Sequence, residues 1–215
     1  MTVSAMKSEL AIGKFNQLLK SHDAKPPEPL ADLVELLVQS FMMADATDEQ
    51  GLAAFSKLQR GSVDMNDLRV MLVKEQVGLI GVRYPLAWDR CQLMRRTLMD
   101  LYKKEHKVSL ERLRSVSKRD AKTYLEGLAG ITPYVASRTL LLGLQIHGVP
   151  VDQATVDVLT EAEVLSDGGD PVEVAALLGR HVLAEDALQA HAALRKATDR
   201  FLGSGRVPRL GKKKK

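Results

Sequence analysis

The sequence contains a single cysteine, Cys91, so no disulfide bond can form within the chain. One cysteine also cannot supply the ligands of a structural zinc site or of an iron–sulfur cluster, and we expect no metal and no such cofactor. Aromatic residues make up only 4% of the 215 residues, whereas leucine, alanine, valine and methionine are frequent. This composition favours helices over a β-sandwich or a β-barrel.

Long apolar runs are also missing. The most apolar stretch, TLLLGLQIHGVPV, is interrupted by Gln145 and His147 and is too short to cross a bilayer. The first twenty residues are amphipathic, unlike the continuous apolar block of a secretory signal. The lack of a membrane span leads us to expect a soluble protein with no membrane partner, and low cysteine usage suits a reducing cytoplasm. We further expect a monomer, nucleoid-associated if the source is prokaryotic.

The charge of the chain is unevenly distributed. The net charge of +4 equals that of Lys212–Lys215, so residues 1–211 are neutral overall. The stretch from Arg90 to Lys122 contains eleven Lys or Arg and four Asp or Glu. The stretch from Asp152 to Asp199 contains ten Asp or Glu and three Lys or Arg. The basic stretch could contact phosphates or form a solvated helix face. The four lysines could bind a polyanion or only keep the chain soluble.

Apolar residues recur at helical spacing, and no segment alternates with period two, so we predict an all-α protein. Thr47 with Gln50 is a capping-box pair, and Thr132 before Pro133 is the favoured order at a helix start. Helices are predicted before Pro26, at about 31–44, 47–60, 85–106, 117–128, 133–147 and 185–202, and from about 65, 152 and 171 onward.

A short turn, LAGITP at residues 128–133, separates two of these helices. Such a turn points unpaired backbone amides outward, and the next helix adds the positive end of its dipole. The turn can therefore hold a phosphate without side-chain specificity, and Gly130 supplies the freedom that a tight bend needs. The alternative is that the turn merely connects two helices.

The order helix, glycine-containing hairpin, helix and Val-Asp pair resembles the helix-hairpin-helix DNA glycosylase superfamily, especially its endonuclease III branch. In that family the hairpin reads Leu-Pro-Gly-Val-Gly. In the bifunctional enzymes a single residue then separates the hairpin from a lysine. Here Leu128–Thr132 align with the hairpin and Tyr134 with the lysine. The family's catalytic aspartate lies eighteen residues beyond that lysine, as Asp152 lies beyond Tyr134. The resemblance covers about residues 30–200.

The resemblance implies two helical lobes with a cleft between them that contains Asp152. One lobe would comprise residues 31–148, with the hairpin at 128–133, and the other residues 1–30 with 149–203. Residues 204–215 would form a flexible basic tail. The implied partner is double-stranded DNA, contacted by Gly130, Ile131, Thr132, Arg119, Lys122 and Arg138.

The implied activity is base excision, in which a damaged or mismatched base is extruded and its N-glycosidic bond hydrolysed. A carboxylate at Asp152 can stabilise the oxocarbenium character of the sugar and activate a water molecule. Asp152 also precedes a helix and could be only its N-cap. Tyr134 cannot form the imine that a lysine forms, so we expect no lyase activity. It would line the pocket or simply pack at the helix start.

The sequence also departs from the family pattern. Thr132 replaces the second hairpin glycine, and Asp157 lies where an arginine is common. Asp45 stands where a glutamine fills the gap left by the extruded base, and a carboxylate there would be repelled by phosphates. Asp45 could instead cap a helix or lie away from DNA. Two alternatives therefore stay open: a catalytically silent DNA-binding protein, or a helical scaffold that contacts only protein.

Overall fold

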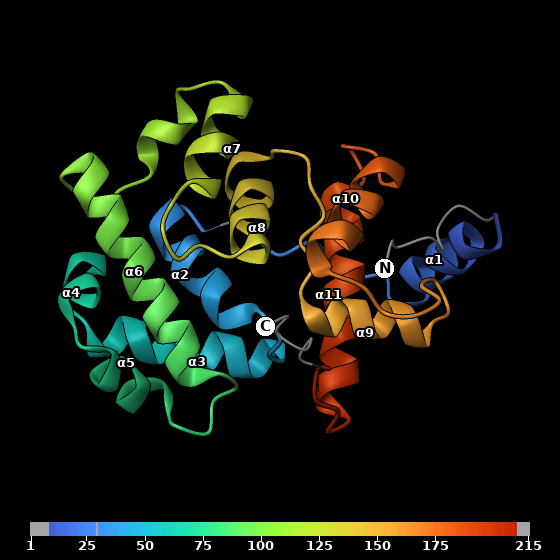
Figure 1. Cartoon of the computed structure of the whole chain (residues 1–215), viewed down its shortest axis with the longest axis horizontal. Coiled ribbons are helices and arrows are strands. Elements are labelled where there is room, and N and C mark those ends of the chain that lie inside the picture. Colours follow the sequence, from blue (N-terminus) through green and yellow to red (C-terminus); the bar gives the residue numbers. More distant parts are fainter. Residues whose placement is uncertain (1–8, 29, 210–215) are drawn as a thin grey trace. The chain divides into compact units, whose positions relative to one another are not determined.

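The computed structural model describes residues 9–28 and 30–209, and the regular elements in these ranges are all helices (Figure 1). The all-α prediction is therefore confirmed for this part of the chain. Lys212–Lys215 lie outside the described residues. In chain order the elements are α1 (Glu9–Ser21), α2 (Leu33–Met43), α3 (Asp48–Gly61), α4 (Met65–Val70), α5 (Val73–Ile80), α6 (Ala87–Glu105), the 3₁₀ helix η2 (Glu111–Arg114), α7 (Lys118–Glu126), α8 (Pro133–Leu144), α9 (Gln153–Glu161), α10 (Pro171–His181) and α11 (Ala187–Gly203).

The chain divides into two compact units. We call Pro29–Ile146 the continuous unit; it contains α2 to α8. We call Met1–Glu28 together with His147–Lys215 the composite unit; it contains α1 and α9 to α11. The composite unit thus joins two distant parts of the sequence, and its described residues place α1 beside α11.

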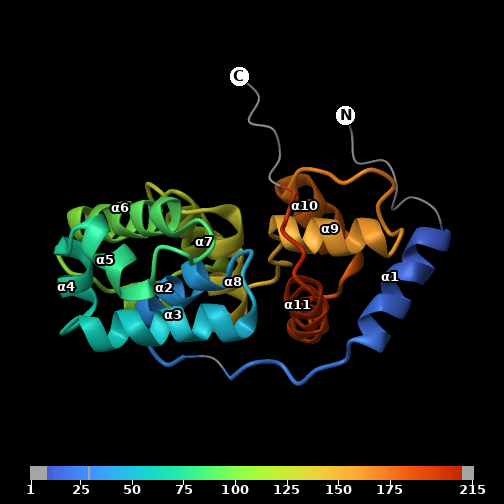
Figure 2. The same ribbon diagram turned by 90° about the horizontal axis from the view of Figure 1, so that it is seen from below.

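Helix α2 forms the centre of the continuous unit. Nine of its eleven residues are buried, because α3, α6 and α8 pack around it (Figures 1 and 2). Helix α8 is buried almost as completely. A helix that is apolar on every side is stable only in such an interior position, and this arrangement makes α2 and α8 the shared core of the unit. The hairpin that precedes α8 is therefore attached directly to the core.

Local sequence determines where several helices begin. Thr47 Oγ1 accepts from the amide of Gln50 at 3.2 Å, and Gln50 Oε1 accepts from the amide of Thr47 at 3.1 Å, which confirms the predicted capping box. Thr132 caps α8, and Pro133 occupies its first turn, as predicted. These bonds satisfy amides that lack a partner inside the helix.

The segment that begins near Met65 differs from the prediction of one helix, because it folds as α4 and α5. The break lies at Leu72, whose backbone is extended and whose amide donates to Glu75 Oε2 at 2.8 Å. This bond caps α5 and stops α4 from continuing through Leu72.

Candidate nucleic-acid interface and buried aspartate

The hairpin at residues 128–133 packs closely against α6. Gly130 has a φ of +89°, and a Cβ added there would lie 2.8 Å from the carbonyl oxygen of Leu93 and 3.0 Å from Cβ of Arg96. Both the left-handed backbone and the close approach require glycine. The predicted need for glycine at this bend is thus explained by two separate constraints, of which the sequence indicated only the first.

The hairpin amides are unequally available to a ligand. The amide of Ala129 donates to Asp100 Oδ2 at 2.9 Å, and that of Ile131 donates to the Leu128 carbonyl at 3.3 Å. Within the described part of the chain, the amides of Gly130 and Thr132 make no hydrogen bond. The expectation was that several amides of the bend point outward; those of Ala129 and Ile131 are engaged, and Gly130 and Thr132 carry the remaining donors.

Asp100 links α6 to the hairpin, a role that sequence reasoning missed. Its Oδ2 also pairs with Lys104 Nζ at 2.8 Å, and the same ammonium donates to the Gly127 carbonyl at 2.9 Å. Burial works to raise the pKa of Asp100, but the bonds from Lys104 and from the Ala129 amide outweigh it and hold the pKa below its ordinary value. Ala129 aligns with a proline of the family motif, so the amide that Asp100 satisfies is one that proline would lack.

Glu105, one turn beyond Asp100, holds the segment before α7. Its carboxylate accepts from Arg112 at 2.8 and 3.2 Å, and these bonds keep its pKa below its ordinary value. Together, Asp100 and Glu105 attach the end of α6 to the hairpin and to η2. No local pattern in the sequence indicates these partners, because they lie 29 and 7 residues away.

We expect the stability of the chain to fall at acidic pH because of these two carboxylates. A carboxyl whose pKa is lower in the folded state stabilises the fold above its unfolded pKa, and this contribution is lost as the pH falls through the folded value. Between about pH 5 and pH 2.5 the wild type should lose more free energy of unfolding than an Asp100→Asn/Glu105→Gln variant. Urea unfolding at a series of pH values measures the free energy of unfolding of each protein. An equal loss of this free energy in the wild type and the variant would contradict the expectation.

Two predicted site residues are buried in the continuous unit. Tyr134 is 5% exposed and belongs to its hydrophobic core. Arg138 is 3% exposed, and its guanidinium donates to Ser40 Oγ at 2.9 Å and to Gln39 Oε1 at 3.0 Å. The expectation that Arg138 contacts DNA is wrong, because its donors join α8 to α2. For Tyr134 the geometry favours the packing role.

In the basic stretch from Arg90 to Lys122, some side chains are held by hydrogen bonds within the protein and others are exposed to solvent. Arg90 is buried and donates to the Phe41 carbonyl at 3.1 Å, and Arg114 donates to the Ala31 carbonyl at 2.8 Å. Arg119 is exposed on α7 and makes no ion pair within the described ranges. Lys122 is exposed and faces Glu126 at 3.8 Å, a surface pair of little energetic weight. Exposed basic side chains without an ion pair in the described part of the chain thus lie on α7, which leads into the hairpin, and also on α6, where Arg96 lies beside Gly130.

Asp45 lies half-buried in the loop between α2 and α3. Its φ is +45°, a left-handed conformation that aspartate adopts more readily than most residues. Thr47, not Asp45, is the N-cap of α3, so the capping alternative for Asp45 is wrong at this helix. Tyr84 and Arg90 donate to the Met42 carbonyl just before this loop, which holds the end of α2 in place.

Asp152 is the N-cap of α9 in the composite unit. Its Oδ1 accepts from the Thr155 amide at 2.9 Å and from Thr155 Oγ1 at 2.6 Å. Its Oδ2 lies 4.0 Å from Arg195 Nη1 on α11, and the residue is 4% exposed. The helix N-terminus and the arginine both bring positive charge close to this carboxylate. Sequence reasoning did not identify Arg195, which lies 43 residues further along the chain.

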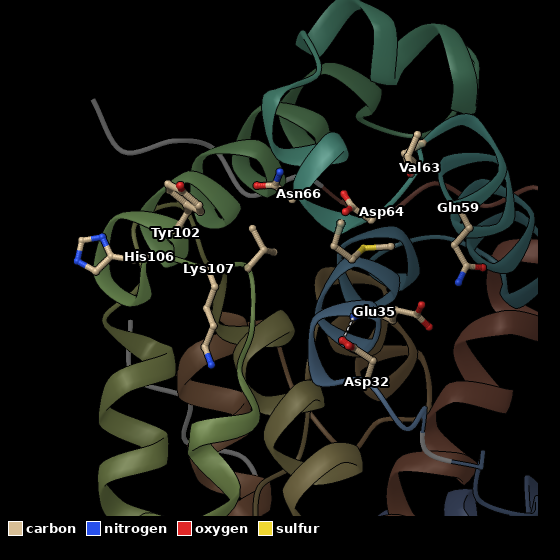
Figure 3. A pocket seen from close by; sticks show the side chains of 12 residues that line it. Asp32, Glu35, Gln59, Val63, Asp64, Asn66, Tyr102, His106 and Lys107 are labelled. Atoms are coloured by element: carbon tan, nitrogen blue, oxygen red, sulfur yellow. Dashed lines mark hydrogen bonds between the residues drawn. The ribbon is translucent and has the colours of Figure 1, made fainter.

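A pocket of about 630 Å³ opens in the continuous unit, and none of the predicted site residues lines it (Figure 3). Side chains from α2, α3, α4 and α6 and from the segments that follow α3 and α6 surround it, including Glu35, Tyr102 and Lys107. Two of its carboxylates cap helices: Asp32 accepts from the Val34 amide at 2.6 Å and Asp64 from the Asp67 amide at 2.7 Å. Helix capping thus accounts for the position of these two carboxylates in the chain.

Searches for other kinds of site gave negative results within residues 9–28 and 30–209. No group of three or more His, Cys, Asp or Glu side chains could hold a metal ion there. No helix of that part of the chain is long and apolar enough to span a membrane. Cys91 is buried in α6, and burial raises the pKa of its thiol to about 12, which makes it a poor nucleophile.

Comparison with known proteins identifies the fold. No protein-family model and no curated protein matches the sequence. Among solved structures, a trapped covalent intermediate of endonuclease III with DNA superposes with a TM-score of 0.63 at 14% identity, covering 87% of this chain and 84% of that one. A thermostable thymine-DNA glycosylase gives a TM-score of 0.61 at 13% identity, with 88% and 85% covered.

A third structure, the 8-oxoguanine glycosylase/lyase of Clostridium acetobutylicum bound to double-stranded DNA with cytosine opposite 8-oxoguanine, gives a TM-score of 0.63 at 14% identity. It covers 94% of this chain and 70% of that one. The chain therefore has the fold of the helix-hairpin-helix DNA glycosylases, and the predicted fold class is confirmed.

Proposed function

We propose that this chain binds double-stranded DNA and acts in base excision repair, hydrolysing the N-glycosidic bond of a damaged or mismatched base. The observation that carries the proposal is Asp152, an N-cap carboxylate 4.0 Å from Arg195 in a chain with the fold of endonuclease III. Such a fixed carboxylate suits the stabilisation of an oxocarbenium-like sugar and the activation of water.

DNA would be held through its backbone. The amides of Gly130 and Thr132 and the dipole of α8 suit a phosphate, and the exposed Arg119 adds positive charge on the preceding helix. These contacts carry no sequence information, so binding should be salt-sensitive and independent of sequence.

Base removal should occur without strand cleavage. A lyase needs an amine that attacks the sugar, and the corresponding position here is Tyr134, whose phenol forms no imine. Borohydride should therefore trap no covalent complex with an abasic duplex. A trapped complex would refute this part of the proposal.

A second candidate function is DNA binding without catalysis. Burial favours it, because Asp152 and Tyr134 are only 4% and 5% exposed. The two functions differ in one measurement, which is base release from duplexes that contain uracil, a thymine mismatch, an oxidised base or an alkylated base. Release that depends on Asp152 supports the enzyme, and binding without any release supports the silent protein.

Replacing Arg119 with glutamine should weaken DNA binding through the loss of one phosphate contact. We expect the slope of log K against log salt concentration to decrease by about 1, for every duplex sequence. Arg112→Gln is the matched control, because it removes the same charge from a side chain that is paired with Glu105. Fluorescence anisotropy over a salt series measures both slopes. Equal slopes for the two variants would exclude Arg119 from the interface.

A further inference from the structure

An exposed apolar patch lies in the continuous unit, where α4 and the turn after it pack beside α6 (Figures 1 and 2). Its four members are Val70, Leu72, Met99 and Tyr102, which are 50%, 49%, 41% and 39% exposed. Single exposed apolar side chains are common on soluble proteins, whereas several side by side indicate a surface that a partner covers.

The contacts of two arginines show that the members of the patch lie close together. The guanidinium of Arg69 lies 4.0 Å from the centroid of the Tyr102 ring, and its Nη1 lies 3.4 Å from Sδ of Met99. One turn earlier on α6, Arg95 Nε donates to the Met71 carbonyl at 3.0 Å. The chain that ends α4 therefore runs along this stretch of α6, and the patch crosses from one helix to the other.

Leu72 is the most unusual member of the patch. It is the N-cap of α5, a position where Ser, Thr, Asp and Asn are preferred because their side chains accept from helix amides. Leucine makes no such bond, and half of this side chain is in solvent. The fold thus gains no cap bond and little core packing from it. A residue that breaks a local rule without a gain in stability indicates another use.

The charge around the patch is positive. Residues 67–75 and 95–103 contain five Lys or Arg and three Asp or Glu. The three acids, Asp67, Glu75 and Asp100, each accept from a backbone amide of the protein. Positive charge therefore prevails at this surface, and it favours a ligand of negative charge.

Two exposed cations flank the patch on α6. Arg96 lies three residues before Met99 and Lys103 four residues after it, so all three side chains share one side of the helix. Both cations are exposed and make no ion pair within residues 9–28 and 30–209. An apolar centre with charged side chains at its edge is the usual anatomy of a protein–protein contact. Phosphates gain little from apolar side chains, so this surface suits a protein better than DNA.

We propose that this surface binds a short acidic segment of a partner protein, in which Asp or Glu stand beside large apolar residues. The apolar side chains of the segment cover Leu72 and Met99, and its carboxylates pair with Arg96 and Lys103. Methionine adapts to different shapes, and Tyr and Arg are frequent among the side chains that carry binding energy. Four apolar side chains form a small surface, which suits a short segment rather than a folded domain.

Random peptides displayed on phage and selected on the full chain test the chemistry of the segment. We expect the selected peptides to contain Asp or Glu next to Leu, Ile or Phe, and their affinity to fall as the salt concentration rises. A selection that yields no peptide, or only basic or uncharged ones, would overturn the proposal.

Leu72→Ser separates binding from folding. Serine supplies the hydroxyl that an N-cap ordinarily uses, so the variant should unfold at the same temperature as the wild type or at a higher one. The selected peptides should nevertheless bind it about 10-fold more weakly. Leu183→Ser is the matched control, because Leu183 is also exposed but belongs to the composite unit, and it should bind them as the wild type does. Equal affinities for the wild type and Leu72→Ser would exclude this surface.

Lys103→Gln tests the contribution of charge. We expect this variant to bind the selected peptides about 3-fold more weakly, the effect of one exposed ion pair. Lys20→Gln removes the same charge from an exposed lysine on α1 and should leave the affinity unchanged. If both variants bind alike, the acidic character of the segment is contradicted. Fluorescence anisotropy of labelled peptides measures each affinity.

Two rival occupants of the surface give different results. If Leu72→Ser weakens the binding of duplex DNA and no acidic peptide is selected, the surface belongs to the DNA interface. If the wild type sediments as a dimer and Leu72→Ser as a monomer, the surface joins two copies of this chain. Either result would refute the proposal.

Discussion

Asp152→Asn should lower the rate of base release about 10²- to 10⁴-fold, the range expected when one group loses its role in proton transfer and charge stabilisation. Asparagine is an equally good N-cap and retains an oxygen that can accept from the Thr155 amide, so α9 should still begin at Gln153. The substitution removes the negative charge that faces Arg195 while it preserves the shape of the side chain. Duplex affinity should change little, because Asp152 contributes no phosphate contact.

Thr155→Val is the matched control for this experiment. It removes the hydroxyl that donates to Asp152 at 2.6 Å but keeps the carboxylate and the capping amide. We expect this variant to lose stability by about 1–3 kcal/mol and to retain most of its rate. Single-turnover release on the most reactive duplex, together with thermal unfolding of each variant, separates the two effects. Equal rates for wild type and Asp152→Asn would end the enzymatic proposal and leave the DNA-binding one.

Gly130→Ala should have the largest effect on the fold and on DNA binding together. A methyl group at this position meets the Leu93 carbonyl at 2.8 Å, and alanine at a φ of +89° is strained. The two costs together are about 2–4 kcal/mol, which the hairpin can relieve only by moving away from α6. Movement would displace the amides of Gly130 and Thr132, so duplex affinity should fall even in the molecules that remain folded.

Gly78→Ala provides the control for Gly130→Ala. Gly78 lies inside α5, and a Cβ there meets no atom within 4 Å. Since alanine is the better helix former, this variant should be more stable by up to about 1 kcal/mol and should bind DNA as the wild type does. Urea unfolding and anisotropy give both quantities for each variant. A Gly130→Ala protein with wild-type stability would show that the bend is not held against α6.

Sequence reasoning reached the fold because its signals are local. The helix starts at Thr47, Thr132 and Asp170 depend on side chains within three residues of the amides they cap. The hairpin and the Val-Asp pair at fixed spacing then indicated one known fold, and comparison confirmed it. The division between α4 and α5 was missed, because leucine at position 72 looks like a continuing helix and only the Glu75 bond reveals the break.

The individual site residues were harder to predict. Arg119 and Arg138 look equally suited to phosphate contact in the sequence, yet only Arg119 is exposed. Arg138 finds its partners Ser40 and Gln39 almost a hundred residues away, in a core that exists only after α2 and α8 pack together. The helical spacing of apolar residues along the sequence carries no information about such distant pairs.

By itself, the sequence determined that this chain is helical, where most helices begin, and that a glycine bend precedes an aspartate at a fixed interval. These properties follow from short-range hydrogen bonds and helical periodicity, which a linear pattern records. Tertiary structure alone decided which charges face outward, which hairpin amides remain available, and that Arg195 lies beside Asp152. Those features depend on contacts between segments far apart in the chain, because burial and pairing are created only when the helices pack.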